Sequence, residues 1–105
     1  MSPTDQLIET KDERLGELLE FLRFPSVSAQ STHNDDVRRC AEWVKDKLNT
    51  IGLKAELHTT AGHPIVFAER HVSDDLPTVL IYGHYDVQPP EPLELWESPP
   101  FEPAG

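Results

Sequence analysis

A run of five residues, at positions 78 to 82, is apolar on both faces of an extended backbone. It reads Thr78-Val79-Leu80-Ile81-Tyr82 and ends at Gly83. A strand with one wet face alternates apolar and polar residues, whereas a continuous apolar run is typical of a central strand covered by helices on both sides. The run therefore predicts an α/β fold in which the residues after Gly83 lie at the carboxyl end of a buried strand, where such sheets bind ligands.

Two stretches before this run repeat apolar residues with the period of a helix. The first predicts a helix over about Asp5–Arg23, with its apolar stripe laid on a core and Pro25 as its end. The second lies between a cap at Asn34 and a stop at Gly52. The two stripes consist of Leu15, Leu18, Leu19 and Leu22, and of Val37, Cys40, Ala41, Val44, Leu48 and Ile51. Because Cys40 lies on the second stripe, a buried core thiol is favoured over a nucleophile or a ligand.

The period changes to two after Gly52, which predicts strands. Residues 54 to 59 alternate between a polar face, which includes His58, and an apolar face. A turn at 61 to 64 separates them from a second strand at Ile65–Ala68, and a loop at 73 to 77 leads to the apolar run. The sequence thus predicts two helices followed by about three strands.

The chain from Pro89 onward holds six prolines and several large apolar residues. The prolines exclude regular structure, and a polar linker would lack the apolar groups. We expect an ordered loop in which Trp96 and Phe101 serve as anchors to the core and not as a substrate wall.

Gly83-His84-Tyr85-Asp86 follows the apolar run directly. In an extended backbone, residues two apart point to the same side, so the imidazole of His84 and the carboxylate of Asp86 are expected to face one pocket. A metal-bound histidine usually donates its other ring N–H to a carboxylate or a carbonyl, and Asp86 can accept it. Taken alone, this triplet is a weak signal for a metal site.

A longer string resembles a known family. The segment Val79-Leu80-Ile81-Tyr82-Gly83-His84-Tyr85-Asp86-Val87-Gln88-Pro89-Pro90, followed by Trp96-Glu97-Ser98-Pro99-Pro100-Phe101, is similar to the first signature block of the M20 metallopeptidases. Upstream, Phe24-Pro25-Ser26-Val27-Ser28 and Val66-Phe67-Ala68 resemble the same family, in the expected order. No Gly-x-Ser-x-Gly elbow surrounds Ser26 or Ser28, so serine hydrolase chemistry is not supported.

The resemblance implies that residues 1–105 are the N-terminal portion of a zinc-peptidase catalytic domain, an α/β/α domain with a mixed sheet. It makes His84 a ligand of one Zn²⁺ in a two-metal site, with Mn²⁺ or Co²⁺ as alternatives, and Asp86 the catalytic carboxylate that positions His84. Metal-activated water would attack the amide bond of a small peptide substrate or an acylated amino acid. Gln88 resembles the dipeptidase, carnosinase-like branch, and a deacylase or desuccinylase is the alternative within the family.

The resemblance also implies what these residues lack. The bridging aspartate, the glutamate base and the other ligands of the family follow this block, and none of His33, His58, His63 and His71 matches them. We therefore expect the 105-residue chain to be inactive by itself. A non-catalytic truncated remnant, or a small acidic binding domain of the same fold, is the rival interpretation, and a homodimer of the complete protein stays open.

The charge and the cysteine content of the chain indicate which partners and which cellular compartment to expect. The chain carries 19 acidic and nine basic side chains, a formal net charge of -10, which argues against nucleic acid and membranes as partners. Its length suits one folding unit, or a piece of one. One cysteine permits no internal disulfide and the polar N-terminus does not resemble a secretory signal, so we expect a cytoplasmic protein.

Overall fold

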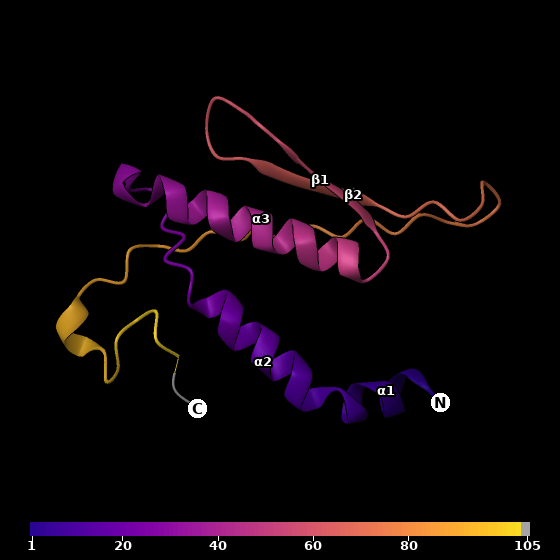
Figure 1. Ribbon diagram of the computed structural model, residues 1–105, viewed down its shortest axis with the longest axis horizontal. Coiled ribbons are helices and arrows are strands. Elements are labelled where there is room, and N and C mark those ends of the chain that lie inside the picture. The colour runs from indigo at the N-terminus through magenta and orange to yellow at the C-terminus, as the bar shows by residue number, and fades with distance from the viewer. Residues whose placement is uncertain (104–105) are drawn as a thin grey trace. The chain divides into compact units, whose positions relative to one another are not determined.

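The computed structural model describes residues 1–103, drawn as the coloured ribbon in Figure 1. The chain divides into two compact units. One unit combines Met1–Pro25 with the described residues from Pro90 onward, and the other is Ser26–Pro89. The fold class is α/β, as predicted, with three α-helices and one two-stranded sheet among the described residues. No helix in this part of the chain has the length and apolar character needed to cross a bilayer.

The first unit begins with two helices where one was predicted. Helix α1 is Pro3–Glu9 and helix α2 is Lys11–Leu22, with a break at Thr10 (φ -98°, ψ 10°). The Thr10 hydroxyl donates to the carbonyl of Gln6 at 2.8 Å and accepts from Nε of Arg14 at 3.2 Å. A threonine side chain that bonds the preceding turn competes with the regular helix pattern, which accounts for the break.

The leucine stripe of α2 is not laid on a core within its unit. No residue of α2 is buried, and Leu15, Leu18 and Leu22 are 43 to 50% exposed. This part of the prediction is wrong for the described residues. The physical reason is that the unit contains no strand in its described part, so it offers no sheet face to cover the stripe.

The second unit is built on helix α3, Asn34–Thr50, and an antiparallel hairpin. Strand β1 (Lys54–His58) pairs with strand β2 (Ile65–Glu69) so that Glu56 faces Phe67, and α3 packs along both strands (Figure 1). The apolar residues of β1 are half-buried at alternate positions, as predicted. Strand β2 shows the same alternation, with Val66 and Ala68 half-buried and its other residues exposed. Among residues 1–103, the fully buried apolar residues all belong to this unit, and they are Val27, Val37, Cys40 and Ala41.

Helix α3 confirms most of the second predicted stripe. Cys40 is fully buried as a core thiol, and the chain leaves the helix through Gly52 at φ +97°, a conformation that favours glycine. Two details differ. Asn34 is the first helical residue and His33 is the cap, because a short 3-10 helix (Ser31–His33) precedes it. Ile51 is 66% exposed, since it lies just beyond the last helical residue.

The predicted central strand at Thr78–Tyr82 is absent from this structure. Residues 78 to 82 form no strand, and the side chains of Val79, Leu80, Ile81 and Tyr82 are 81 to 91% exposed. A strand requires hydrogen-bond partners on its edges, and β1 and β2 pair only with each other. The apolar pattern indicates that both faces of the segment should be buried, but no described residues cover either face. The predicted mixed sheet is likewise reduced to an antiparallel hairpin and one parallel bridge, between Val27 and Val87.

The proline-rich segment forms a short 3-10 helix, Leu93–Leu95, and turns. The indole Nε1 of Trp96 donates to the carbonyl of Pro90 at 3.0 Å, so this side chain ties the segment to itself. The expected anchoring of Trp96 in a core is wrong, since half of this residue is exposed, whereas Phe101 is half-buried.

Candidate metal centre

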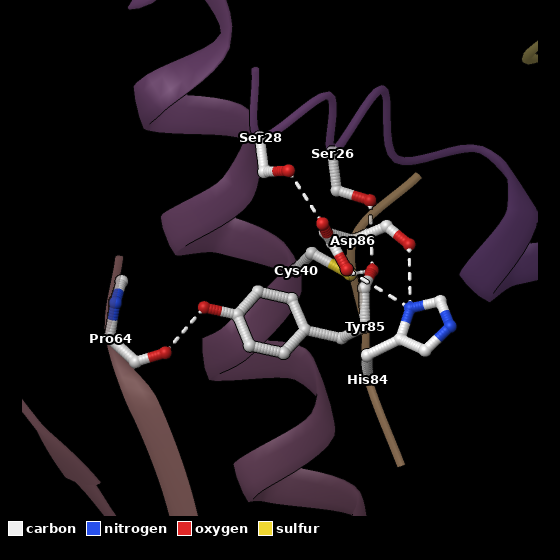
Figure 2. A network of polar contacts seen from close by, with 7 residues as sticks. All are labelled: Ser26, Ser28, Cys40, Pro64, His84, Tyr85 and Asp86. Atoms are coloured by element: carbon white, nitrogen blue, oxygen red, sulfur yellow. Dashed lines mark hydrogen bonds and ion pairs between the residues drawn. The ribbon is translucent and has the colours of Figure 1, made fainter. Parts of the chain in front are cut away.

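The segment that follows the exposed apolar run is held against Ser26–Ser28 (Figure 2). Val27 and Val87 form a parallel bridge, in which the N–H of Val87 donates to the carbonyl of Ser26 at 3.0 Å. The buried hydroxyl of Ser26 donates to the carbonyl of Tyr85 at 3.0 Å, and the thiol of Cys40 lies 3.6 Å from the same oxygen. These contacts fix the backbone on which the candidate site stands.

His84 and Asp86 face each other, as their spacing predicts. Nδ1 of His84 lies 3.0 Å from Oδ1 of Asp86 and 3.1 Å from its carbonyl oxygen (Figure 2). Neither oxygen has a hydrogen to donate when the carboxylate is ionised, so the contacts assign the hydrogen of a neutral His84 to Nδ1. Nε2 then carries the lone pair, and the His84 side chain is 75% exposed. The contact is thus confirmed, and Nε2 is free to bind a ligand from solvent.

Ser28 completes the arrangement and was missed as a functional residue. Its hydroxyl donates to Oδ2 of Asp86 at 2.5 Å, leaving Oδ1 for His84. This hydrogen bond is the main reason that the pKa of Asp86 lies below its ordinary value, and the neighbouring His84 lowers it further. The carboxylate therefore stays ionised and acts as an acceptor. The Phe24–Ser28 string was a signal for this residue, but no spacing rule links it to a position 58 residues later.

His63 and Tyr85 connect the site to the turn that precedes β2. Nε2 of His63 lies 2.8 Å from the carbonyl oxygen of Ser28, and the hydroxyl of Tyr85 donates to the carbonyl of Pro64 at 2.5 Å. The turn before β2 is thereby joined to both segments of the site. The remaining histidines make local pairs with acidic neighbours instead: His33 with Asp36, His58 with Glu56 and His71 with Asp74.

The donor set fits part of a metal site. A ring nitrogen that faces solvent, on an imidazole whose other nitrogen is held by a carboxylate, is the usual form of a histidine ligand. A zinc site takes about three or four protein ligands, however. Within residues 1–103 no group of three or more His, Cys, Asp or Glu side chains is placed to hold a metal ion. What the described residues offer is one exposed imidazole, that of His84, with the carboxylate of Asp86 at its Nδ1.

Burial of the thiol beneath the site predicts a loss of stability at alkaline pH. Burial raises the pKa of Cys40 above its ordinary value of 9.0. As the pH rises past that value, the unfolded thiol ionises first, so the folded state binds more protons and its stability falls. We expect the free energy of unfolding to decrease above about pH 8.5, by at most about 1.4 kcal/mol per pH unit for this group.

Urea unfolding at several alkaline pH values measures this dependence, with Cys40→Ala as the matched variant. Burial also raises the pKa of Tyr85, whose ordinary value is 10.0, so its contribution begins at a higher pH. The variant should lose the decrease that starts near the thiol's ordinary pKa. An identical pH slope in both proteins would contradict the expectation.

Sequence comparison finds related enzymes. A cysteinylglycine-S-conjugate dipeptidase of Corynebacterium striatum is 30% identical over 91% of this chain, and a Cys-Gly metallodipeptidase of Schizosaccharomyces pombe is 33% identical over 87%. A succinyl-diaminopimelate desuccinylase of Burkholderia lata is 32% identical over 72%. The chain spans about a fifth of the length of these curated relatives, 21% of each. No protein-family model matches it.

Structure comparison agrees in fold. The solved structure of the dipeptidase Dug1p of Saccharomyces cerevisiae matches 93% of this chain and 23% of its own, with a TM-score of 0.82 and 23% identity. At that identity the likeness shows the fold alone. Because the signature block around His84 and the 30 to 33% identity across most of the chain agree, the chain belongs to the M20 family of metallopeptidases.

Proposed function

We propose that this chain is the N-terminal portion of a catalytic domain that hydrolyses the amide bond of small peptides with the help of a bound metal, in the cytoplasm. The observation that carries the proposal is the contact between Nδ1 of His84 and Oδ1 of Asp86, which leaves Nε2 directed at solvent as a metal ligand. The metallodipeptidase relatives support a metal and a peptide substrate.

The chemistry that a bound zinc supplies to such a site is polarisation of the scissile carbonyl and activation of a water. The residues of this chain would hold and orient the metal. His84 holds its lone pair on Nε2 because Asp86 keeps the proton on Nδ1. The negative charge of Asp86 makes the imidazole a better electron donor. Zinc is the proposed metal, and Mn²⁺ and Co²⁺ would accept the same imidazole ligand.

Substrate choice divides the relatives, which include dipeptidases and desuccinylases. We propose a dipeptide, because Gln88 resembles the dipeptidase branch. The test uses the longest polypeptide that the gene encodes, purified without metal and then loaded with zinc, manganese or cobalt. Cys-Gly should be cleaved in a chelator-sensitive manner, and succinyl-diaminopimelate should not. Cleavage of the succinylated substrate alone would reverse the assignment, and turnover of neither would sink the proposed function.

The rival function, a non-catalytic acidic domain of the same fold, is favoured by one observation: the chain carries 19 acidic and nine basic side chains, a formal net charge of -10. It predicts that no encoded form of the protein cleaves either substrate. The peptidase proposal predicts turnover once the remaining ligands and a general base are present.

The 105-residue chain should bind zinc weakly and cleave no dipeptide, under either proposal. A single imidazole with nearby carboxylates is an incomplete shell, so we expect a dissociation constant above about 1 μM. Isothermal titration of the metal-free chain with zinc measures this constant, and His84→Ala is the matched variant. Sub-micromolar affinity that disappears in His84→Ala would show that further ligands exist. Chelator-sensitive hydrolysis by this chain would show that a complete site exists.

A further inference from the structure

Ser28 is the point at which the candidate site is joined to the rest of its unit. Its hydroxyl donates to Oδ2 of Asp86 at 2.5 Å, and its carbonyl oxygen lies 2.8 Å from Nε2 of His63. Its neighbour Val27 is fully buried and bridged to Val87. The backbone of Ser28 is therefore held on two sides, whereas its side chain contacts a single functional group.

We propose that Ser28 is a positioning residue, which fixes the rotation of the Asp86 carboxylate and thereby determines which nitrogen of His84 carries the proton. The catalytic importance of this role rests on the proposed function, whereas the effect of Ser28 on Asp86 and His84 does not. Asp86 is 40% exposed and its carboxylate can rotate about the bond to Cβ. With Oδ2 held by Ser28, Oδ1 is the oxygen that faces Nδ1 of His84.

The backbone carbonyl of Asp86 sets a limit on the effect. It lies 3.1 Å from the same Nδ1, so it can accept the hydrogen without any help from Ser28. A neutral carbonyl is a weaker acceptor than a carboxylate, because charge-assisted hydrogen bonds are about twice as strong as neutral ones. Losing the carboxylate should therefore weaken the preference for Nδ1–H without abolishing it.

Ser26 provides a matched control two residues away. Its hydroxyl donates to the carbonyl of Tyr85 at 3.0 Å and contacts neither Asp86 nor His84. Removing the hydroxyl of Ser26 perturbs the same segment at a more deeply buried position, since Ser26 is 2% exposed and Ser28 is half-buried. An effect on His84 that appears in Ser28→Ala and not in Ser26→Ala is thus not a general consequence of loosening this segment.

The experiment measures the tautomer of neutral His84 by long-range ¹H–¹⁵N NMR in the 105-residue chain without metal. The original protein should show mainly Nδ1–H. Asp86→Ala, in which only the backbone carbonyl is left, defines the lower reference. Ser28→Ala should shift His84 toward Nε2–H, close to that reference, whereas Ser28→Thr and Ser26→Ala should match the original protein. If Ser28→Ala does not fold, Ser28→Cys, with its weaker donor, should give an intermediate population.

Three results of the NMR experiment would contradict the proposed role of Ser28. An unchanged tautomer in folded Ser28→Ala or Ser28→Cys overturns it, and so does an unchanged tautomer in Asp86→Ala, because Ser28 would then have nothing to act through. Equal shifts in Ser26→Ala and Ser28→Ala would also overturn it. The tautomer does not depend on hydrolysis, so a failed activity assay leaves this result intact. In an active longer polypeptide, Ser28→Ala should lower kcat up to about tenfold with little change in KM, and Ser28→Thr should restore it.

Discussion

Under the proposed function, His84→Ala is expected to remove both a bound metal and the hydrolysis of dipeptides from the longest polypeptide that the gene encodes. The proposed ligand atom is Nε2 of His84, and alanine offers no replacement. The rate should fall by about a thousandfold or more, because catalytic zinc needs all of its protein ligands to keep its coordination. Metal stoichiometry by atomic emission, measured beside the rate, gives one equivalent fewer than in the original protein.

Asp86→Asn should separate the two quantities that His84→Ala changes together. Asparagine keeps the size of the side chain and can still accept the Nδ1 hydrogen, and the hydroxyl of Ser28 can accept from its amide. Geometry survives, but the negative charge behind the imidazole is lost. We expect metal affinity to fall about 10- to 100-fold while most of the metal remains bound at saturating concentration, and activity to fall further. A fully active Asp86→Asn enzyme would reduce the candidate site to His84 alone.

Val37→Asp is expected to unfold the second unit. Val37 is fully buried on α3, and the same core contains only three other fully buried apolar residues. An unpaired carboxylate in an apolar site costs several kcal/mol, which is comparable with the total stability of about 3–10 kcal/mol for a unit of this size. Circular dichroism should show lost helix signal, and the urea transition should shift or vanish.

Val79→Asp is the matched control for that substitution. It places the same charge in the same unit, but the Val79 side chain is 81% exposed. We expect the urea midpoint to change little, as for other surface substitutions. If Val79→Asp unfolds the chain as Val37→Asp does, then residues 78 to 82 are buried in solution, and their exposure in this structure is not maintained there.

Local features of the sequence predicted local features of the fold. The helical period around Cys40, the stop at Gly52, the period-two pattern of β1 and the presence of a second strand at β2 all depend on nearby residues, and all are confirmed. The spacing of His84 and Asp86 likewise predicted their contact. These features need no knowledge of distant parts of the chain.

The errors arise where the outcome depends on distant partners or on a side chain that competes with the backbone. The apolar pattern of Thr78–Tyr82 indicates that other elements should cover both faces of the segment. It does not indicate whether residues 1–103 contain those elements. The helix break depends on one hydroxyl, that of Thr10, bonding the preceding turn. Ser28 reaches Asp86 across 58 positions, and periodicity has no signal for such a pair. Serine is common enough that its presence alone says nothing about a partner.

The backbone that carries His84 is fixed on one side only. Downstream, Val87 is bonded to Ser26, whereas upstream residues 78 to 83 have no strand partner among residues 1–103. Ordering the backbone of one residue costs about 1–2 kcal/mol of free energy. A metal that binds His84 here must offset this cost, which a neighbouring strand would otherwise offset. Pairing along 78 to 82 and metal binding at His84 are therefore thermodynamically linked, and each raises the affinity of the other by the same factor. A zinc affinity measured on the isolated chain is thus a lower limit for these residues once that strand has neighbours.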